Sequence, residues 1–194
     1  IDTYDNKNNQ INDWRKSGFT IAQLIPEGGM MPGKTAIVLF GNPSSTNILS
    51  QNSALVVKFQ AARGGGRIYP GTPLGIMAKF RDVYKNAELA SRHGKLFASN
   101  NGLNRPEINK TYEAMYPVVD KNIPVLFEAN DDIEIRRALS LQKENGFRLI
   151  LSGVSSVEKV TNEIKAANAQ VLLSMKLPDD KVTKAKMEEL SEEM

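Results

Sequence analysis

The sequence predicts an α/β fold built on a parallel sheet, and the centre of the chain provides the evidence. Residues 123–127 and 147–151 are short apolar runs bounded by turn residues, which is typical of fully buried strands. Between them, apolar residues recur at helical spacing, namely Ile135, Ala138, Leu139 and Leu141. A strand, a helix and a second strand in this order form a βαβ unit, whose two strands run parallel.

The first third of the chain predicts short strands separated by turns. Residues 1–10 are polar and indicate a loop or a frayed end, and a short helix is expected over 11–17, ended by Gly18. Strands are expected over 19–25, 35–40, 48–50 and 54–60, the third of them paired with the second. Residues 27–34 contain two glycine or proline pairs and predict a loop.

Residues 61–75 form a long stretch rich in glycine and proline, and such a loop is usually functional or mobile. Thr72 is expected to cap the next helix, with Pro73 in its first position. That helix is predicted to run to about Arg92 and to end at His93 and Gly94. Its expected apolar face consists of Leu74, Met77, Phe80, Val83, Tyr84, Ala87 and Leu89, and Arg81 and Asp82 predict a surface ion pair.

The later elements continue the alternation of strands and helices. A helix is expected over 106–115, with Glu107 in its first turn. In the central unit, Asp131 or Asp132 is expected to cap the start of the helix, and Gly146 is expected to end it. Ser156 predicts the start of another helix through 167, with Val157, Val160 and Ile164 buried, followed by a third parallel strand over 170–175. This rhythm fits half of a (β/α) barrel or an open doubly wound sheet.

Composition limits the function classes. The 194 residues, 41% of them hydrophobic, suit one α/β domain or a piece of a larger one. We expect an α/β domain over 1–178, followed by a charged tail or exposed helix over 179–194. The net charge is only +3 and no basic stripe is interleaved with aromatics, which argues against a nucleic-acid partner. No apolar run approaches the ~18 residues of a membrane span. The absence of cysteine excludes disulfides and thiolate chemistry, and the start at Ile1 suggests an excised or processed piece.

Candidate site residues follow from the parallel sheet, because ligands of such folds bind beyond the carboxyl ends of the strands. Glu128, Asn130, Asp131, Ser152 and Gly153 stand at those ends. Glu128 could be a metal ligand or a general base, but equally a helix cap or the partner of an arginine. Asn130 and Asp131 fit helix caps or ligand-facing residues. The amides after Thr72 could bind an anion or simply begin a capped helix.

Several segments, taken in order, resemble a known family. They are Gly-Phe-Thr at 18–20, Pro-Glu-Gly-Gly at 26–29, Gly-Lys-Thr-Ala at 33–36, Tyr-Pro-Gly-Thr-Pro-Leu-Gly at 69–75, Ile-Pro-Val-Leu-Phe-Glu-Ala at 123–129 and Gly-Phe-Arg-Leu-Ile-Leu-Ser-Gly at 146–153. In order and spacing the chain resembles, over about 11–178, the middle of an amidohydrolase of the imidazolonepropionase-like group found in large bacterial exported proteins. The resemblance implies a metal-dependent (β/α)₈ barrel that hydrolyses C–N bonds, often in cyclic amides, with a water activated by a divalent, zinc-type metal.

The chain departs from the family in its metal ligands. It has one histidine, His93, and it lacks both the His-x-His pair of the first barrel strand and the segment with the final aspartate. Glu128 and the Ser152-Gly153 pair stand where many members place histidines. The resemblance therefore implies a partial (β/α)₈ barrel, an internal segment of a larger, exported (periplasmic) bacterial protein.

Two functions follow as expectations. In the first, the intact parent hydrolyses C–N bonds, while this chain alone holds no metal and is inactive, because a hydrolytic metal needs at least three protein ligands. In the alternative, the chain is a degenerate, non-catalytic barrel that acts as a scaffold or binds a small molecule. An incomplete barrel leaves edge strands open, so the expected partners are the missing parts of the barrel or a second copy of the chain in a homo-oligomer.

Overall fold

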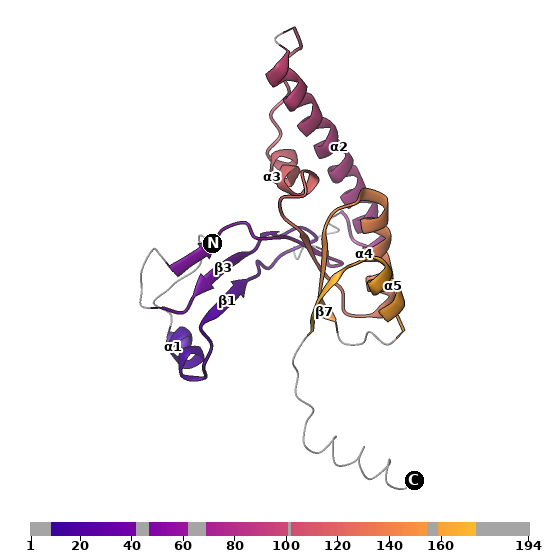
Figure 1. Cartoon of the computed structure of the whole chain (residues 1–194). Helices are drawn as coiled ribbons and strands as arrows, with labels where there is room; N and C mark the ends of the chain where they lie inside the picture. The colour runs from indigo at the N-terminus through magenta and orange to yellow at the C-terminus, as the bar shows by residue number, and fades with distance from the viewer. Residues whose placement is uncertain (1–8, 42–46, 62–68, 101, 155–158, 174–194) are drawn as a thin grey trace.

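The computed structural model describes residues 9–41, 47–61, 69–100, 102–154 and 159–173 (Figure 1). The predicted tail over 179–194, Ser156 and Val157 lie outside these ranges. The elements within them are α1 (Asn9–Lys16), β1 (Ile21–Leu24), β2 (Gly33–Lys34), β3 (Ala36–Leu39), β4 (Ile48–Ser50), β5 (Leu55–Lys58), α2 (Pro73–Ser99), α3 (Lys110–Val119), β6 (Val125–Glu128), α4 (Asp132–Asn145), β7 (Leu149–Val154), α5 (Thr161–Ala166) and β8 (Gln170–Leu173).

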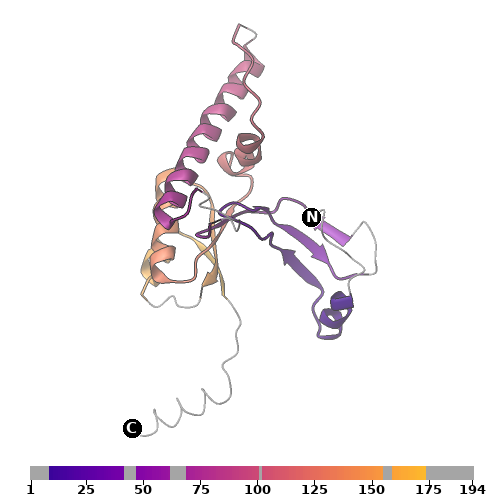
Figure 2. The ribbon, with the colours of Figure 1, turned by 180° about the vertical axis from the view of Figure 1, so that it is seen from behind.

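The strands form two sheets in a mixed α/β fold. The larger sheet has the order β2-β5-β6-β7-β8, in which β5 to β8 run parallel and β2 pairs antiparallel with β5. The smaller sheet, β1-β3-β4, is antiparallel, and with α1 it is set to one side of the α/β body (Figures 1 and 2). The predicted βαβ unit is confirmed as β6-α4-β7, and the short strand over 48–50 does pair with its predicted partner. β2 is a short strand where a loop was expected.

Alternating residues of the parallel strands supply two cores on opposite faces of the sheet. On the face covered by helices, Phe80 and Tyr84 of α2 meet Phe127 of β6 and Phe147, which precedes β7. The ring centroids of Phe80 and Phe147 are 5.5 Å apart, an edge-to-face arrangement that aromatic pairs favour. On the other face, a smaller cluster contains Ala54, Val56, Leu126 and the partly buried Ile150.

The longest helix, α2, differs most from its predicted bounds. It continues through His93 and Gly94 and ends only at Ser99, so both residues lie inside it and His93 does not occupy a helix C-terminus. The helix α3 lies beside its outer half (Figure 1), and packing of this kind outweighs the cost of about 1 kcal/mol for glycine in a helix interior. Leu74 and Leu89 were placed on the buried face wrongly, since they are 72% and 58% exposed.

Three other elements begin or end at residues that differ from the predicted ones. The helix expected over 106–115 begins at Lys110, because the Asn109 side chain caps it by accepting from the amides of Thr111 and Tyr112, at 3.0 and 3.4 Å. It then runs through Pro117 to Val119. The strand β7 does not end at Ser152-Gly153 but continues to Val154. The helix α5 begins at Thr161 rather than near Ser156.

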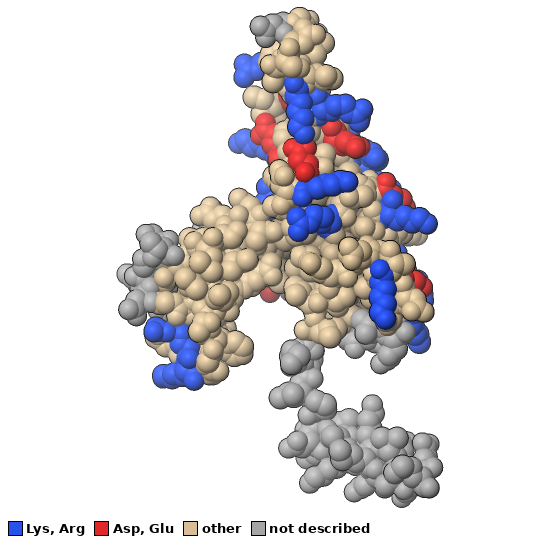
Figure 3. Space-filling view, in the orientation of Figure 1, with Lys and Arg blue, Asp and Glu red and all other residues tan. Residues whose placement is uncertain are grey.

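Charged side chains of both signs are interspersed over the surface around α2 (Figure 3). Arg81 and Asp82 do not pair with each other: Asp82 binds Lys79, while Arg81 reaches across to Glu144 of α4. Within the described ranges, no helix combines the length and the apolar character needed to cross a membrane.

The ion pair between Arg81 and Glu144 predicts a pH effect. Arg81 Nη2 lies 2.8 Å from Glu144 Oε1, and hydrogen bonding by the guanidinium lowers the pKa of the Glu144 carboxyl. A carboxyl with a lowered folded pKa stabilises the fold above its unfolded pKa of about 4.3, and this stabilisation is lost as the pH falls through the folded pKa. Both side chains are about 40% exposed, so solvent screening limits the contribution to under about 1 kcal/mol.

The expected result is that Glu144→Gln is less stable than the wild type at about pH 7, and that the gap is smaller at about pH 3, below the unfolded pKa. Urea unfolding at both pH values measures the difference. A gap that stays constant with pH would show that the pair contributes through side-chain packing rather than through charge.

Candidate functional site

An ion pair stands at the carboxyl ends of the two central parallel strands. Lys58, the last residue of β5, is in register with Glu128, the last residue of β6, and its Nζ lies 2.8 Å from Glu128 Oε2. The Lys58 side chain is only 12% exposed and that of Glu128 is 36% exposed. Of the roles considered for Glu128, the structure shows ion pairing, with a lysine in place of the expected arginine.

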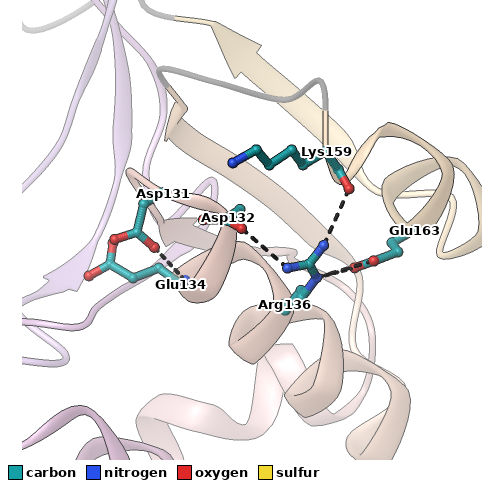
Figure 4. Close-up of polar contacts among 6 residues, drawn as sticks. All are labelled: Asp131, Asp132, Glu134, Arg136, Lys159 and Glu163. Carbon is teal, nitrogen blue, oxygen red and sulfur yellow. Dashed lines mark hydrogen bonds and ion pairs between the residues drawn. The ribbon is translucent and has the colours of Figure 1, made fainter.

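The next two candidates lie where β6 leads into α4. Asp131 is the N-cap of α4, and its carboxylate accepts from the amide of Glu134 at 2.8 Å (Figure 4). The Glu134 carboxylate reaches back and accepts from the amide of Asn130 at 2.9 Å. Such reciprocal capping satisfies amides that the first helical turn leaves unpaired. Asp131 is thus a cap, as the sequence allowed, and Asn130 is exposed beside it.

The same end of α4 is tied to α5 by Arg136. Its guanidinium binds Asp132 at 3.2 Å, Glu163 of α5 at 3.1 Å and the carbonyl of Lys159 at 3.3 Å (Figure 4). Arg136 therefore fixes the N-terminal half of α4, and with it the position of Asn130 and Asp131. This role was not predicted from the sequence, because two of the three partners of Arg136, Lys159 and Glu163, lie outside α4.

A bulge in β7 brings the last two strand-end candidates to the same place. The pairing of β7 with β8 shifts register between Ser152 and Val154, and Gly153 between them has a φ of +75°. A Cβ at Gly153 would lie 2.9 Å from Asn130 Oδ1 and 3.4 Å from Glu128 Cγ. Ser152 is buried and its carbonyl accepts from the amide of Ala129 at 2.9 Å. Bulges of this kind often lie beside functional sites.

Gly153→Ala is therefore expected to lower the free energy of unfolding by about 1–2 kcal/mol from the left-handed backbone alone, with a further loss from the contact with Asn130. Chemical denaturation of Gly153→Ala, Asn130→Ala and the double variant separates the two causes. The double variant should recover the loss due to contact and keep the backbone loss. If the effects of the two single changes simply add, the close approach does not matter.

Thr72 is not part of this group. Its hydroxyl accepts from the amide of Gly75 at 3.2 Å and caps α2, which is the simpler of its two predicted roles. It is not among the residues that line the cavity at the strand ends. No contact that the structure gives for Thr72 indicates an anion site.

Two of the strand-end candidates, Glu128 and Asn130, line a cavity of about 320 Å³ together with Lys58, Phe59, Gln60 and Glu134, whereas Asp131, Ser152 and Gly153 are not among its lining residues. All of the lining residues but Phe59 are polar or charged, so the cavity suits a small polar molecule. Four of the lining residues were not predicted as site residues: Lys58, Phe59, Gln60 and Glu134. A lysine near the end of an otherwise apolar strand was the signal that could have identified Lys58, because a charge there needs a partner.

The carboxylates at these strand ends are poorly placed to bind a metal. Among the described residues, no group of three or more His, Cys, Asp or Glu side chains is placed to hold a metal ion. The Glu128 carboxylate faces the Lys58 ammonium, and those of Asp131 and Glu134 bind backbone amides. Since a hydrolytic zinc site needs three protein ligands, this donor set does not fit one.

No protein-family model matches the sequence, and a comparison with curated proteins found no similar sequence. A solved structure does share the fold: an amidohydrolase from Thermotoga maritima MSB8 superposes with a TM-score of 0.78 at 19% sequence identity. The alignment covers 90% of this chain and 47% of that structure, so the chain spans about half its length. The likeness confirms an amidohydrolase-like α/β fold.

Proposed function

We propose that this chain is a segment of a hydrolase with an amidohydrolase-like fold, whose intact form cleaves C–N bonds of the cyclic-amide type. The observation that supports this most is the pair of Lys58 and Glu128, which lines a polar cavity at the carboxyl ends of parallel strands. The likeness to an amidohydrolase structure supports the same reading. In this proposal the parallel sheet is part of a (β/α)₈ barrel, with the cavity on its substrate side.

The described residues would then bind and orient the substrate. The Lys58 ammonium can donate to a carbonyl oxygen, and the Glu128 carboxylate can accept from an adjacent N–H group. Asn130 offers both a donor and an acceptor in the same cavity. A cyclic amide presents a carbonyl and an N–H side by side, which matches this arrangement. The zinc-type metal that such hydrolases use would need ligands from outside the described residues.

Zinc content tests whether this chain holds the metal by itself. The purified 194-residue chain and its Glu128→Gln variant are dialysed against zinc and measured by plasma mass spectrometry. We expect less than about a tenth of an equivalent in both, because the described residues bring no three metal ligands together. Close to one equivalent in the wild type, lost in Glu128→Gln, would overturn the view that metal binding and hydrolysis belong to the intact protein.

Ligand binding tests the role of the cavity. Hydantoin, a small cyclic C–N substrate analogue, is titrated into the labelled chain, and the amide resonances of Lys58, Glu128 and Asn130 are followed. They should shift in the wild type and stay unchanged in Glu128→Gln, whereas Asp120→Asn, far from the cavity, should behave as the wild type. Shifts elsewhere, or none, would contradict a substrate-side cavity.

A second candidate is a non-catalytic scaffold or small-molecule-binding module. The ion pair between Lys58 and Glu128 favours this second candidate, because a carboxylate paired with an ammonium is a poor base or metal ligand. Under this candidate hydantoin would bind the isolated chain, and the intact protein would turn over no cyclic amide after zinc loading. The open edges of the sheet would then pair with other parts of the protein or with a second copy.

A further inference from the structure

A second cavity, of about 540 Å³, lies at the opposite end of β5 from the Lys58–Glu128 pair. Leu55, the first residue of β5, lines this cavity, whereas Lys58, the last, lines the other. The remaining walls come from the loop before β2, from β2 and β3, from the turn before β5 and from the first two turns of α3. No residue within the described ranges lines both cavities, so this one is separate from the site proposed for hydrolysis.

The floor of the second cavity is apolar and well anchored. Leu55 and Met115 are 5% and 2% exposed and belong to the main core, and Met31 packs against the same core. Methionine side chains adapt their shape to a ligand, which suits them to line a binding pocket. The volume lies within the range of roughly 300–1,000 Å³ that small-molecule sites occupy.

The charge of the cavity is positive, and it comes from one residue. Among the described residues that line the cavity, Lys34 is the single side chain with a charge at neutral pH. Within the described part of the chain, Lys34 has neither an ion pair nor a side-chain hydrogen bond. Burial lowers the pKa of its ammonium, because desolvation disfavours the charged form. A partly buried cation without a counter-charge is therefore available to an anionic ligand.

The backbone beside Lys34 is held firmly. Lys34 pairs with Leu55 in the antiparallel ladder of β2 and β5. The next residue, Thr35, is fully buried, and its hydroxyl lies 2.7 Å from that of Ser53 and accepts from the Gln23 amide at 3.0 Å. The cavity wall that carries the cation is thus formed before any ligand arrives, which reduces the entropy lost on binding.

We infer that this cavity binds a small molecule with an apolar body and a single carboxylate, the body resting on Leu55, Met31 and Met115 and the carboxylate on the Lys34 ammonium. Gln51, Asn52 and Thr111 line the same cavity and offer polar groups to the rest of the ligand. The inference is independent of the proposed hydrolase function, because it uses none of the same residues.

Isothermal titration of the 194-residue chain with 2-naphthoate, and with the neutral 2-naphthalenemethanol, tests the inference. The carboxylate should bind the wild type at least about tenfold more tightly than the alcohol, because a charge-assisted hydrogen bond is made only by the former. Lys34→Met should remove this preference, and Lys34→Arg should keep most of it. The matched control is Lys16→Met, which removes a lysine of α1 whose side chain is 81% exposed. This variant should bind both ligands as the wild type does.

A second variant tests the location independently of charge. Ala114 is an exposed residue of α3 that lines the cavity, so Ala114→Trp should fill the space without disturbing the core and abolish binding of both ligands. Thermal melts confirm that each variant is folded. Three outcomes would overturn the inference: no binding to the wild type, equal affinity for the acid and the alcohol, or undiminished binding by Ala114→Trp.

Discussion

Replacing Phe80 by alanine is expected to lower the free energy of unfolding by about 3–5 kcal/mol, the largest effect of any single change considered for this chain. Phe80 is fully buried and its ring lies within 6.3 Å, centroid to centroid, of those of Tyr84, Phe127 and Phe147. These rings come from α2, from β6 and from the residue pair before β7. Removing the Phe80 ring would leave a cavity where the helix meets the sheet.

Leu89→Ala is the matched control. Leu89 lies on the same helix and is also a large apolar residue, but its side chain is 58% exposed. Its replacement by alanine should therefore change the free energy of unfolding by no more than about 0.5 kcal/mol. Denaturant unfolding of both variants gives the comparison. Similar losses for the two would mean that the aromatic cluster does not hold α2 to the sheet.

Glu128→Leu is expected to cost about 2–3 kcal/mol, the second largest effect. The loss arises mainly at its partner, because the Lys58 ammonium, only 12% exposed, is left without a counter-charge. The fully buried case costs about 3–5 kcal/mol, and the partial exposure of Glu128 reduces it. Lys58→Met should cost less, about 1 kcal/mol, because the Glu128 carboxylate that remains can still reach water.

The double variant Lys58→Met with Glu128→Leu isolates the charge effect. It should be more stable than Glu128→Leu alone, since it removes the unpaired ammonium. Urea unfolding of the four proteins of the cycle supplies the coupling energy. A double variant less stable than either single variant would mean that the two side chains contribute through packing and not as a pair.

The features that the sequence predicted correctly are mostly those set by local chemistry. Asp131 and Thr72 cap their helices because a side-chain oxygen reaches amides within the next three residues. Gly146 ends α4 because its φ of +69° suits glycine. The central βαβ unit followed from apolar runs and helical spacing, which need no distant partner to be recognised.

The features that were missed depend on contacts between distant parts of the chain. The full length of α2 requires α3 beside it, and the exposure of Leu89 depends on where α3 and α4 lie. The partner of Glu128 is set by the parallel register of β5 and β6, which sequence spacing alone does not reveal. The grouping of Glu128, Asn130, Ser152 and Gly153 was predicted, because the carboxyl ends of parallel strands meet at one edge of the sheet. The second cavity was not predicted, because it forms between elements whose packing against each other the sequence does not reveal.

The short strand β5 has a consequence for local opening of the native state. Its four residues contribute Leu55 to one cavity and Lys58 to the other, so any fluctuation that detaches β5 from β2 and β6 would disrupt both proposed binding sites at once. A ligand in either cavity would then bind only the closed state and slow hydrogen exchange at the same backbone amides. Exchange protection along β5 would thus rise with occupancy at either end, and the two ligands would favour each other's binding without any change of shape.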